Sequence, residues 1–168
     1  MIASEEAQFK VICENMVNLK LLQLPTLQLQ SADPIEYLAN LKNLENIVIG
    51  LSRTCIDEQL LKVLPNLKHL KRVQFVLCGI TDKSLSMFSK HCPDLQDIEI
   101  YNYNEAYVIT DESVKSLSEL KDLQTLCIPQ AKISEKSVRE LLSKCRKVKR
   151  LQIDGFNEDP QTVIAQLN

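Results

Sequence analysis

Six cysteines and two histidines are the side chains of this sequence best suited to nucleophilic catalysis or metal binding. They are Cys13, Cys55, Cys78, Cys92, Cys127, Cys145, His69 and His91. No two cysteines have the C-x-x-C spacing of a zinc site. In "KHCPD", the neighbouring side chains of His91 and Cys92 would point about 100° apart on a helix. The sequence therefore predicts buried thiols and no metal site.

Catalysis by a thiol is an alternative, with Cys78 or Cys127 as the nucleophile, but the sequence identifies no base and orienting group beside either one. The three glycines, Gly50, Gly79 and Gly155, form neither a G-x-G-x-x-G nor a G-x-x-x-x-G-K loop. We therefore expect a non-catalytic protein without a cofactor or a small-molecule substrate.

The charge balance bears on the kind of partner. A formal net charge of -2 and a pI of about 5.8 disfavour a nucleic-acid or anionic-membrane surface. Apolar stretches such as "LKLLQLPTLQL" fall far short of the ~20 residues of a membrane helix. The N-terminal "MIASEEAQFK" has acids where a secretory signal has bases. These features predict a cytoplasmic or nuclear protein.

A repeated strand phrase organises the chain. Six segments share apolar first, fourth and sixth positions: "LKLLQL" from Leu19, "LENIVI" from Leu44, "LKRVQF" from Leu70, "LQDIEI" from Leu95, "LQTLCI" from Leu123 and "VKRLQI" from Val148. Their spacings are 25, 26, 25, 28 and 25 residues. Alternation of apolar and variable residues predicts a half-buried strand at the end of each segment. A period of this length predicts a stack of similar units.

A second phrase follows four of these segments and predicts a helix start. It reads "CIDEQL" at 55, "ITDKSL" at 80, "ITDESV" at 109 and "ISEKSV" at 133. Apolar residues at helical spacing come next, as at Leu85, Phe88 and Cys92. The hydroxyls and acids of the phrase are expected to cap the free N–H groups of each helix. Strand and helix units of this size must stack to share a core, with a parallel sheet on the concave side.

The sequence resembles the leucine-rich repeats, in particular the cysteine-containing subtype found in F-box substrate receptors and related to ribonuclease inhibitor. The segment "LKRVQFVLCGITDKSLSMFSKHCPDL", residues 70 to 95, matches the pattern L-x-x-L-x-L-x-x-C-x-x-I-T-D, helix, C-P-x-L with one residue fewer after Cys78. The resemblance implies an α/β solenoid and a role as a substrate-recognition or adaptor subunit of a ubiquitin ligase. The F-box itself has no counterpart in the first 17 residues.

The predicted domain organisation is a single leucine-rich repeat domain over residues 1–168. Residues 1–17 are expected to form a capping helix, because Phe9, Ile12, Cys13 and Met16 make a helical apolar stripe. About six repeats of 25 to 28 residues then fill residues 18–168.

Strand alternation predicts which side chains face away from the core. They include Gly50, Cys127 and Pro129 and a mixed set of charged and polar residues. The fourth repeat is longer than its neighbours, and its extra residues fall in "YNYNEAYV" between strand and helix. Tyrosine is enriched where proteins bind each other. We therefore predict a protein-binding surface made by Arg72, Gln74, Asp97, Glu99, Tyr101, Tyr103, Tyr107, Arg150 and Gln152.

Overall fold

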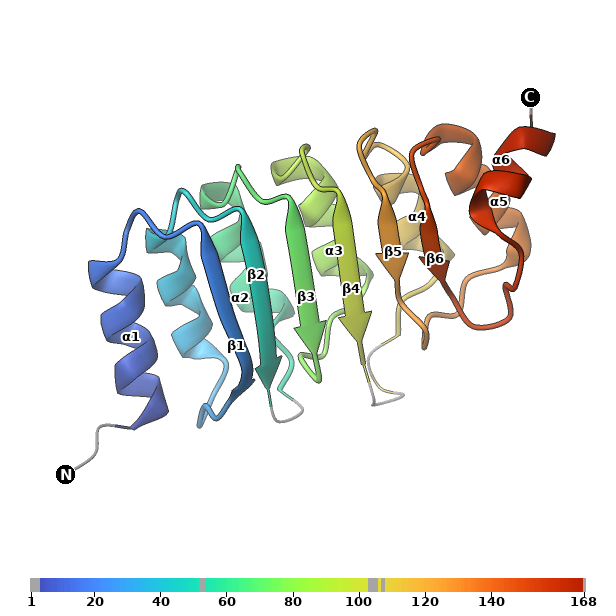
Figure 1. Ribbon diagram of the computed structural model, residues 1–168. Helices are drawn as coiled ribbons and strands as arrows, with labels where there is room; N and C mark the ends of the chain where they lie inside the picture. Colours follow the sequence, from blue (N-terminus) through green and yellow to red (C-terminus); the bar gives the residue numbers. More distant parts are fainter. Residues whose placement is uncertain (1–3, 52–53, 103–105, 107, 168) are drawn as a thin grey trace.

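The computed structural model describes residues 4–51, 54–102, 106 and 108–167. Within these residues six strands form one parallel sheet, in the order in which they occur in the chain. The strands are β1 (Leu21–Leu27), β2 (Asn46–Leu51), β3 (Arg72–Val76), β4 (Asp97–Tyr101), β5 (Thr125–Cys127) and β6 (Arg150–Gln152). Figure 1 shows them side by side along the length of the molecule.

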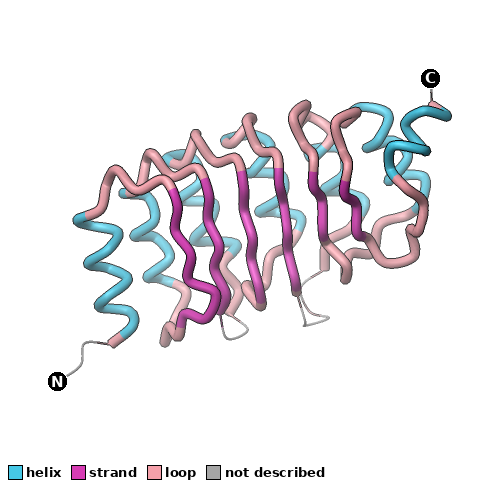
Figure 2. Tube along the Cα trace, in the orientation of Figure 1, coloured by secondary structure: helices cyan, strands magenta, loops and turns pink. Residues whose placement is uncertain are grey.

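Helices form a second layer on one face of this sheet, as Figures 1 and 2 show. They are α1 (Glu5–Asn15), the 3-10 helix η1 (Asp33–Asn40), α2 (Asp57–Val63), the 3-10 helix η2 (Leu64–Asn66), α3 (Asp82–His91), α4 (Asp111–Leu117), α5 (Glu135–Lys144) and α6 (Pro160–Gln166). No helix of the described residues covers the opposite sheet face, which is called the concave face below. The protein is therefore an α/β solenoid of the leucine-rich repeat type.

The core lies between the two layers and is built from the repeated apolar positions. In the third repeat Leu70, Val73 and Phe75 are at most 1% exposed. The Phe75 ring lies 6.0 Å from that of Phe88 on α3, centroid to centroid. Burying one such side chain stabilises the fold by about 1.5–3 kcal/mol. Because the same positions are filled in every repeat, the core is continuous along the stack.

The helix-start phrases interlock neighbouring repeats. Thr81 accepts a hydrogen bond from Lys83 N of its own helix, as the sequence predicts. The acid of the phrase, however, bonds to the next repeat instead of its own helix. Asp57 accepts from Thr81 N at 3.1 Å, from Thr81 Oγ1 and from Ser84 Oγ at 2.6 Å. Each acid therefore fixes the cap of the following helix.

The same arrangement recurs twice along the array. Asp82 accepts from Thr110 N at 2.8 Å and from Thr110 Oγ1 at 2.7 Å. Asp111 accepts from Ser134 N at 2.8 Å, and this bond lowers the pKa of the Asp111 carboxyl. The hydroxyls of Thr110 and Ser134 in turn cap α4 and α5. These links form a polar ladder parallel to the apolar core.

Both ends of the described chain pack a helix against the stack. On α1, Phe9 and Cys13 are buried, and the helix lies beside η1. On α6, Val163 and Ile164 are buried, and the helix packs beside α5. Asp159 caps α6 by accepting a hydrogen bond from Thr162 N at 2.8 Å. No described helix is long and apolar enough to cross a membrane.

Candidate functional site

The parallel register aligns concave-face side chains into rows that cross the strands. One row contains Asn46, Arg72, Asp97, Thr125 and Arg150, and the next contains Val48, Gln74, Glu99, Cys127 and Gln152. Adjacent strands of a sheet are about 4.8 Å apart, so neighbours in a row are within reach of one another. Six of the predicted binding residues, Arg72, Gln74, Asp97, Glu99, Arg150 and Gln152, lie in these two rows.

Arg72 and Asp97 form an ion pair between β3 and β4. Arg72 Nε and Nη2 lie 3.0 Å and 2.9 Å from Asp97 Oδ2. The Arg72 side chain is 56% exposed, whereas that of Asp97 is 16% exposed. A pair this accessible contributes about 0–1 kcal/mol to stability. Its main effect is to hold the guanidinium at the surface in a fixed position.

Glu99 joins two other predicted residues. Tyr101 Oη donates a hydrogen bond to Glu99 Oε2 at 2.9 Å, and Arg150 Nη1 lies 3.6 Å from Glu99 Oε1. Burial, followed by the bond to the Glu99 carboxylate, raises the pKa of Tyr101 to about 12. The phenol is therefore neutral at physiological pH and holds the carboxylate in place. Arg72, Asp97 and Arg150 belong to the first row and Glu99 to the second, and Tyr101 follows Glu99 on β4. These five residues together are called the charged row below.

Some residues that alternation places on the concave face are buried, which corrects that part of the sequence analysis. Cys127 is 0% exposed, and Gly50 and Pro129 are also buried. The ion pair between Arg150 on β6 and Glu99 on β4 spans β5, to which Cys127 belongs. Alternation along a strand predicts the face to which a side chain points. It does not predict whether side chains from neighbouring strands cover and bury that side chain.

The buried cysteines are packing residues with protonated thiols. Cys78 donates to the carbonyl oxygens of Val76 at 3.2 Å and Ile49 at 3.4 Å, and Cys92 donates to that of Leu67 at 3.3 Å. Burial raises the pKa of Cys78 and of Cys92 to about 12. Burial raises the pKa of Cys127 as well. Because the thiolate is the nucleophile, the geometry disfavours catalysis by Cys78 or Cys127.

Cys55 departs from the prediction that all six thiols are buried. It is exposed, whereas the other five cysteines are buried. Its thiol lies at the start of the phrase before α2 and donates to Gly79 O at 3.2 Å. The equivalent residues in the later phrases, Ile80, Ile109 and Ile133, are buried. Sequence alignment of the phrases gave no sign of this difference.

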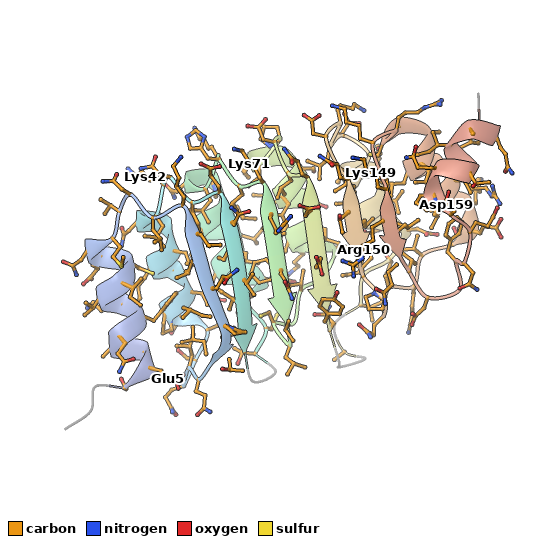
Figure 3. The ribbon with its side chains drawn as sticks, in the orientation of Figure 1. Glu5, Lys42, Lys71, Lys149, Arg150 and Asp159 are labelled. Atoms are coloured by element: carbon orange, nitrogen blue, oxygen red, sulfur yellow. The ribbon has the colours of Figure 1, made fainter. Side chains whose placement is uncertain are left out.

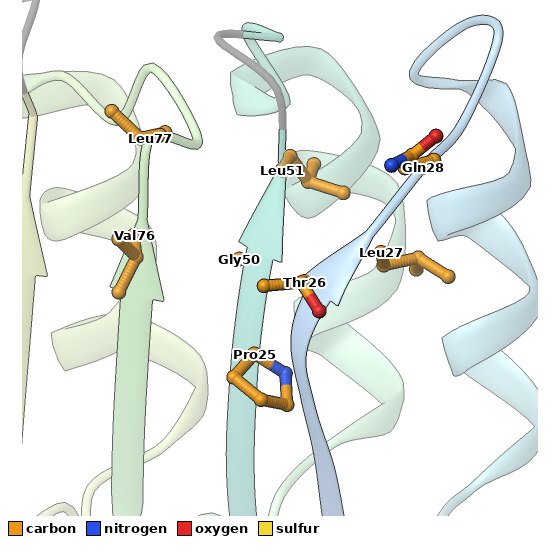
Figure 4. Close-up of a pocket in the computed structure, with 8 residues that line it drawn as sticks. All are labelled: Pro25, Thr26, Leu27, Gln28, Gly50, Leu51, Val76 and Leu77. Carbon is orange, nitrogen blue, oxygen red and sulfur yellow. The ribbon is translucent and has the colours of Figure 1, made fainter.

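A hollow beside the carboxyl ends of β1, β2 and β3 was not anticipated (Figure 4). Its volume is about 200 Å³, and its lining includes Pro25, Gly50, Val76 and Leu77. The register between β1 and β2 shifts after Leu24. A Cβ added to Gly50 would lie 1.9 Å from Pro25 O, so this close approach requires glycine. Pro25, which directly follows the phrase "LKLLQL", was the available signal, because proline in strands marks bulges.

The lengthened loop of the fourth repeat is only partly within the described residues. Tyr103 and Tyr107 lie outside them, so the structure does not place these two predicted binding residues. The described start of the loop is anchored, because Asn102 is buried. Its Oδ1 accepts from Ile80 N at 3.2 Å and its Nδ2 donates to Ile80 O at 2.6 Å. The loop therefore begins from a fixed point at the end of β4.

Comparison with known proteins finds similarity both in sequence and in structure. No protein-family model matches the chain. The antagonist of mitotic exit network protein 1 of Candida glabrata is 27% identical over 127 residues, which is 74% of this chain and 25% of that protein. The chain thus spans about a quarter of the length of this curated relative.

Solved structures share the fold at low sequence identity. An internalin of Listeria monocytogenes superimposes with a TM-score of 0.65 and 16% identity, covering 95% of this chain and 49% of the internalin chain. Actin-binding site 2 of leiomodin-1 gives 0.57 and 14%, covering 80% and 84%. The C-terminal domain of Caenorhabditis elegans tropomodulin gives 0.56 and 11%, covering 79% and 90%. These likenesses support the leucine-rich repeat architecture.

Proposed function

We propose that this chain is a non-catalytic protein-interaction module that binds a partner protein through its concave face. The charged row is the observation on which the proposal rests. Its exposed arginines, Arg72 and Arg150, flank the half-buried acids Asp97 and Glu99, and Tyr101 adjoins them. Arginine and tyrosine, like tryptophan, are enriched among the residues that contribute most of the binding energy at protein interfaces.

The geometry suits recognition of another protein because its side chains are already positioned. Ion pairs and the Tyr101 hydrogen bond hold the row before a partner arrives, so less side-chain freedom is lost on binding. Gln74 and Gln152 lie in the second row and add amide groups that can donate and accept. We also assign Tyr103 and Tyr107 to this surface, since their loop follows directly from β4.

A charge reversal at the centre of the row tests the proposal. Glu99→Arg places a cation beside Arg150 and removes the acceptor of Tyr101. Affinity capture from cognate cell extract, followed by titration of the purified captured protein, should show at least roughly tenfold weaker binding. Lys136→Glu, on the exposed surface of α5, is the matched control and should bind as the wild type does.

Thermal melting of each variant separates a binding defect from unfolding. If Glu99→Arg melts like the wild type and binds the same proteins with the same affinity, the concave face is not the binding surface. The remaining candidate surfaces would then be the helical face and the two ends of the stack.

We further propose that the partner belongs to a ubiquitin ligase and that the chain acts as its substrate-recognition or adaptor part, in the cytoplasm or nucleus. Support comes from the cysteine-containing repeat pattern, in which Cys78, Cys92 and Cys145 all donate to carbonyl groups of the preceding repeat. A relative named for antagonism of the mitotic exit network is consistent with a regulatory role. The native full-length protein should co-purify with ligase subunits, and reproducible absence of every such subunit would refute this assignment.

A further inference from the structure

The hollow at the carboxyl ends of β1, β2 and β3 interrupts a row of concave-face residues that continues to the charged row. Gly50 pairs in register with Val76, and Val76 pairs with Tyr101. Figure 4 shows Gly50 on β2 between Pro25 on β1 and Val76 on β3. Because Gly50 contributes no side chain, β2 does not fill the space between its two neighbours. A hollow of about 200 Å³ remains there, and it is called the anchor hollow below.

The lining of the anchor hollow is mainly apolar and is open to solvent. Pro25 is exposed, Val76 and Leu77 are half-buried, and Leu27 and Leu51 are buried. Of the described non-glycine residues, only Leu77 has a positive φ, at 59°. Leucine rarely adopts this left-handed conformation, and backbone outliers cluster at active sites and ligand-binding sites. The fold therefore keeps accessible an apolar surface that neighbouring side chains could have filled.

The size of the anchor hollow suits one side chain of a partner protein. Pockets that bind cofactors and drug-sized molecules measure about 300–1,000 Å³. A cavity of about 150 Å³ is large enough to hold a benzene ring. At about 200 Å³, the anchor hollow can accommodate one Phe or Leu side chain but not a cofactor. Interfaces concentrate their binding energy at points where one large side chain fills a well-packed pocket.

An exposed guanidinium lies on the same strand as one wall of the hollow. Arg72 and Val76 are four residues apart on β3, which is roughly 13 Å at ~3.3 Å per residue, and both face the concave side. Arg72 Nε and Nη2 both donate to one oxygen of Asp97, and the Arg72 side chain is 56% exposed. The remaining N–H groups of its fork can therefore donate to a second carboxylate. Arg150 lies at the opposite end of the concave face, on β6 (Figure 3).

We propose that the anchor hollow binds one Phe or Leu side chain of an extended segment of the partner protein, and that Arg72 binds an Asp or Glu four residues from that anchor. Side chains four residues apart in an extended segment lie on one face and roughly 13 Å apart, as Arg72 and Val76 do. The hollow is continuous with the charged row, because Val76 pairs with Tyr101 and Arg72 is itself in the row. The proposal rests on the proposed function, since it takes the concave face as the binding surface.

A nine-residue peptide tests the anchor hollow without knowledge of the natural partner. The probe is ESGSFSGSE, in which a Glu lies four residues to either side of the Phe, so it fits both directions of the segment. Titration into the whole ¹⁵N-labelled chain should shift the amide NMR signals of Gly50, Val76 and Leu77. Replacing the Phe of the peptide by Ser should weaken binding at least roughly tenfold. Replacing both Glu residues by Gln should weaken it about two- to fivefold.

Two variants that fill the hollow test it from the side of the protein. Val76→Trp on β3 and Thr26→Trp on β1, whose side chain also lines the hollow, should each bind the peptide at least roughly tenfold more weakly. Arg72→Gln should weaken binding about two- to fivefold. The matched control is Val11→Trp, at an exposed position on α1, which should bind within about twofold of the wild type. Thermal melting of each variant separates a loss of binding from unfolding.

Several results would overturn the proposal. They are wild-type peptide affinity in both folded filling variants, equal binding of the peptide that lacks Phe, and no binding of the peptide to the wild type at millimolar concentration. Binding of N-acetylphenylalanine amide as tightly as the whole peptide would indicate a small-molecule site instead. Tighter binding of a single-stranded oligonucleotide than of the peptide would equally exclude a protein segment as the ligand.

The anchor hollow and the concave-face proposal can fail separately. Glu99→Arg leaves the lining of the hollow unchanged. If Glu99→Arg loses its partner while Val76→Trp and Thr26→Trp capture the partner and bind the peptide as the wild type does, the anchor hollow alone is wrong. If Glu99→Arg and both filling variants capture the partner as the wild type does, the concave face is not the binding surface.

Discussion

At the scale of single residues, the chemistry of this protein is set by burial more than by residue type. The same thiol group is exposed at Cys55 and buried at Cys78 and Cys92, where the pKa is raised to about 12. Burial likewise raises the pKa of Cys13 to about 12 and of Cys145 to about 11. Reactivity should therefore differ strongly among six chemically identical side chains.

Alkylation under native conditions should modify Cys55 first. Its thiol is accessible to the reagent, whereas the five buried thiols react only after the fold opens. Mass spectrometry over time should show one fast modification per chain, which Cys55→Ser abolishes. Fast modification of a second cysteine in the Cys55→Ser variant would show that the core is more open than described.

His91 should make stability dependent on pH. Its Nε2 is buried without a hydrogen-bond partner in the part of the chain that the structure describes. Burial, then the charges of Lys90 and Lys68, lower its pKa below the ordinary value of 6.5. The unfolded chain therefore binds a proton at a higher pH than the folded chain does. The stabilising contribution is complete above about pH 6.5 and declines as the pH falls towards the lowered folded pKa.

Urea denaturation across this pH range tests the His91 prediction. Wild type should lose more unfolding free energy than His91→Gln as the pH is lowered from about 7.5 to about 5.5. His69→Gln, at an exposed position, is the control and should follow the wild type. Identical pH profiles for the wild type and His91→Gln would rule out His91 as the source.

At the scale of elements, the phrase at each helix start explains how one repeat aligns the next. The hydroxyl of each phrase caps its own helix. The acid of the preceding repeat accepts hydrogen bonds from that hydroxyl and from the backbone N–H of the same residue. The sequence predicted the caps because hydroxyl and acid are favoured at helix starts. It did not predict the direction of the acid, since that depends on how neighbouring repeats are stacked.

Removal of the buried acid should destabilise the stack. Asp57 is 4% exposed and accepts three hydrogen bonds, so Asp57→Ala leaves Thr81 and the fully buried Ser84 with unsatisfied donors. We expect a loss of about 3 kcal/mol in unfolding free energy. Asp82→Ala should cost less, about 1–2 kcal/mol, because Thr110 is half-buried and water can replace the acceptor.

The matched control is Glu58→Ala, next to Asp57 but with a side chain 67% exposed. It should change the unfolding free energy by no more than about 0.5 kcal/mol. Equal effects of Asp57→Ala and Glu58→Ala in chemical denaturation would argue against the ladder as a source of stability.

At the scale of the whole molecule, stability is transmitted between neighbouring repeats. Among the residues that the structure describes, each strand pairs only with the strands before and after it, and each helix packs mainly on its neighbours. A solenoid of this kind behaves approximately as a line of coupled units. Damage at one end should therefore open that end first.

Phe9→Ala tests this end-to-end behaviour. Phe9 on α1 is 1% exposed, and its truncation should cost about 3–5 kcal/mol. Hydrogen exchange should then increase in α1, η1 and β1 while protection in β5 and β6 is retained. Val11→Ala, at a position 58% exposed on the same helix, should leave exchange unchanged. A uniform increase along the whole sheet would contradict the coupled-unit description.

The sequence by itself determined the architecture, because the apolar positions of a repeated strand and helix can be buried only by stacking neighbours. It also predicted that Arg72, Asp97, Glu99 and Arg150 share one sheet face, since alternation along a strand is local. Only the tertiary structure decided which of these residues pair, that Cys127 is covered and that Gly50 must approach Pro25. Those outcomes depend on register and on contacts between repeats some 25 residues apart, which local periodicity does not encode.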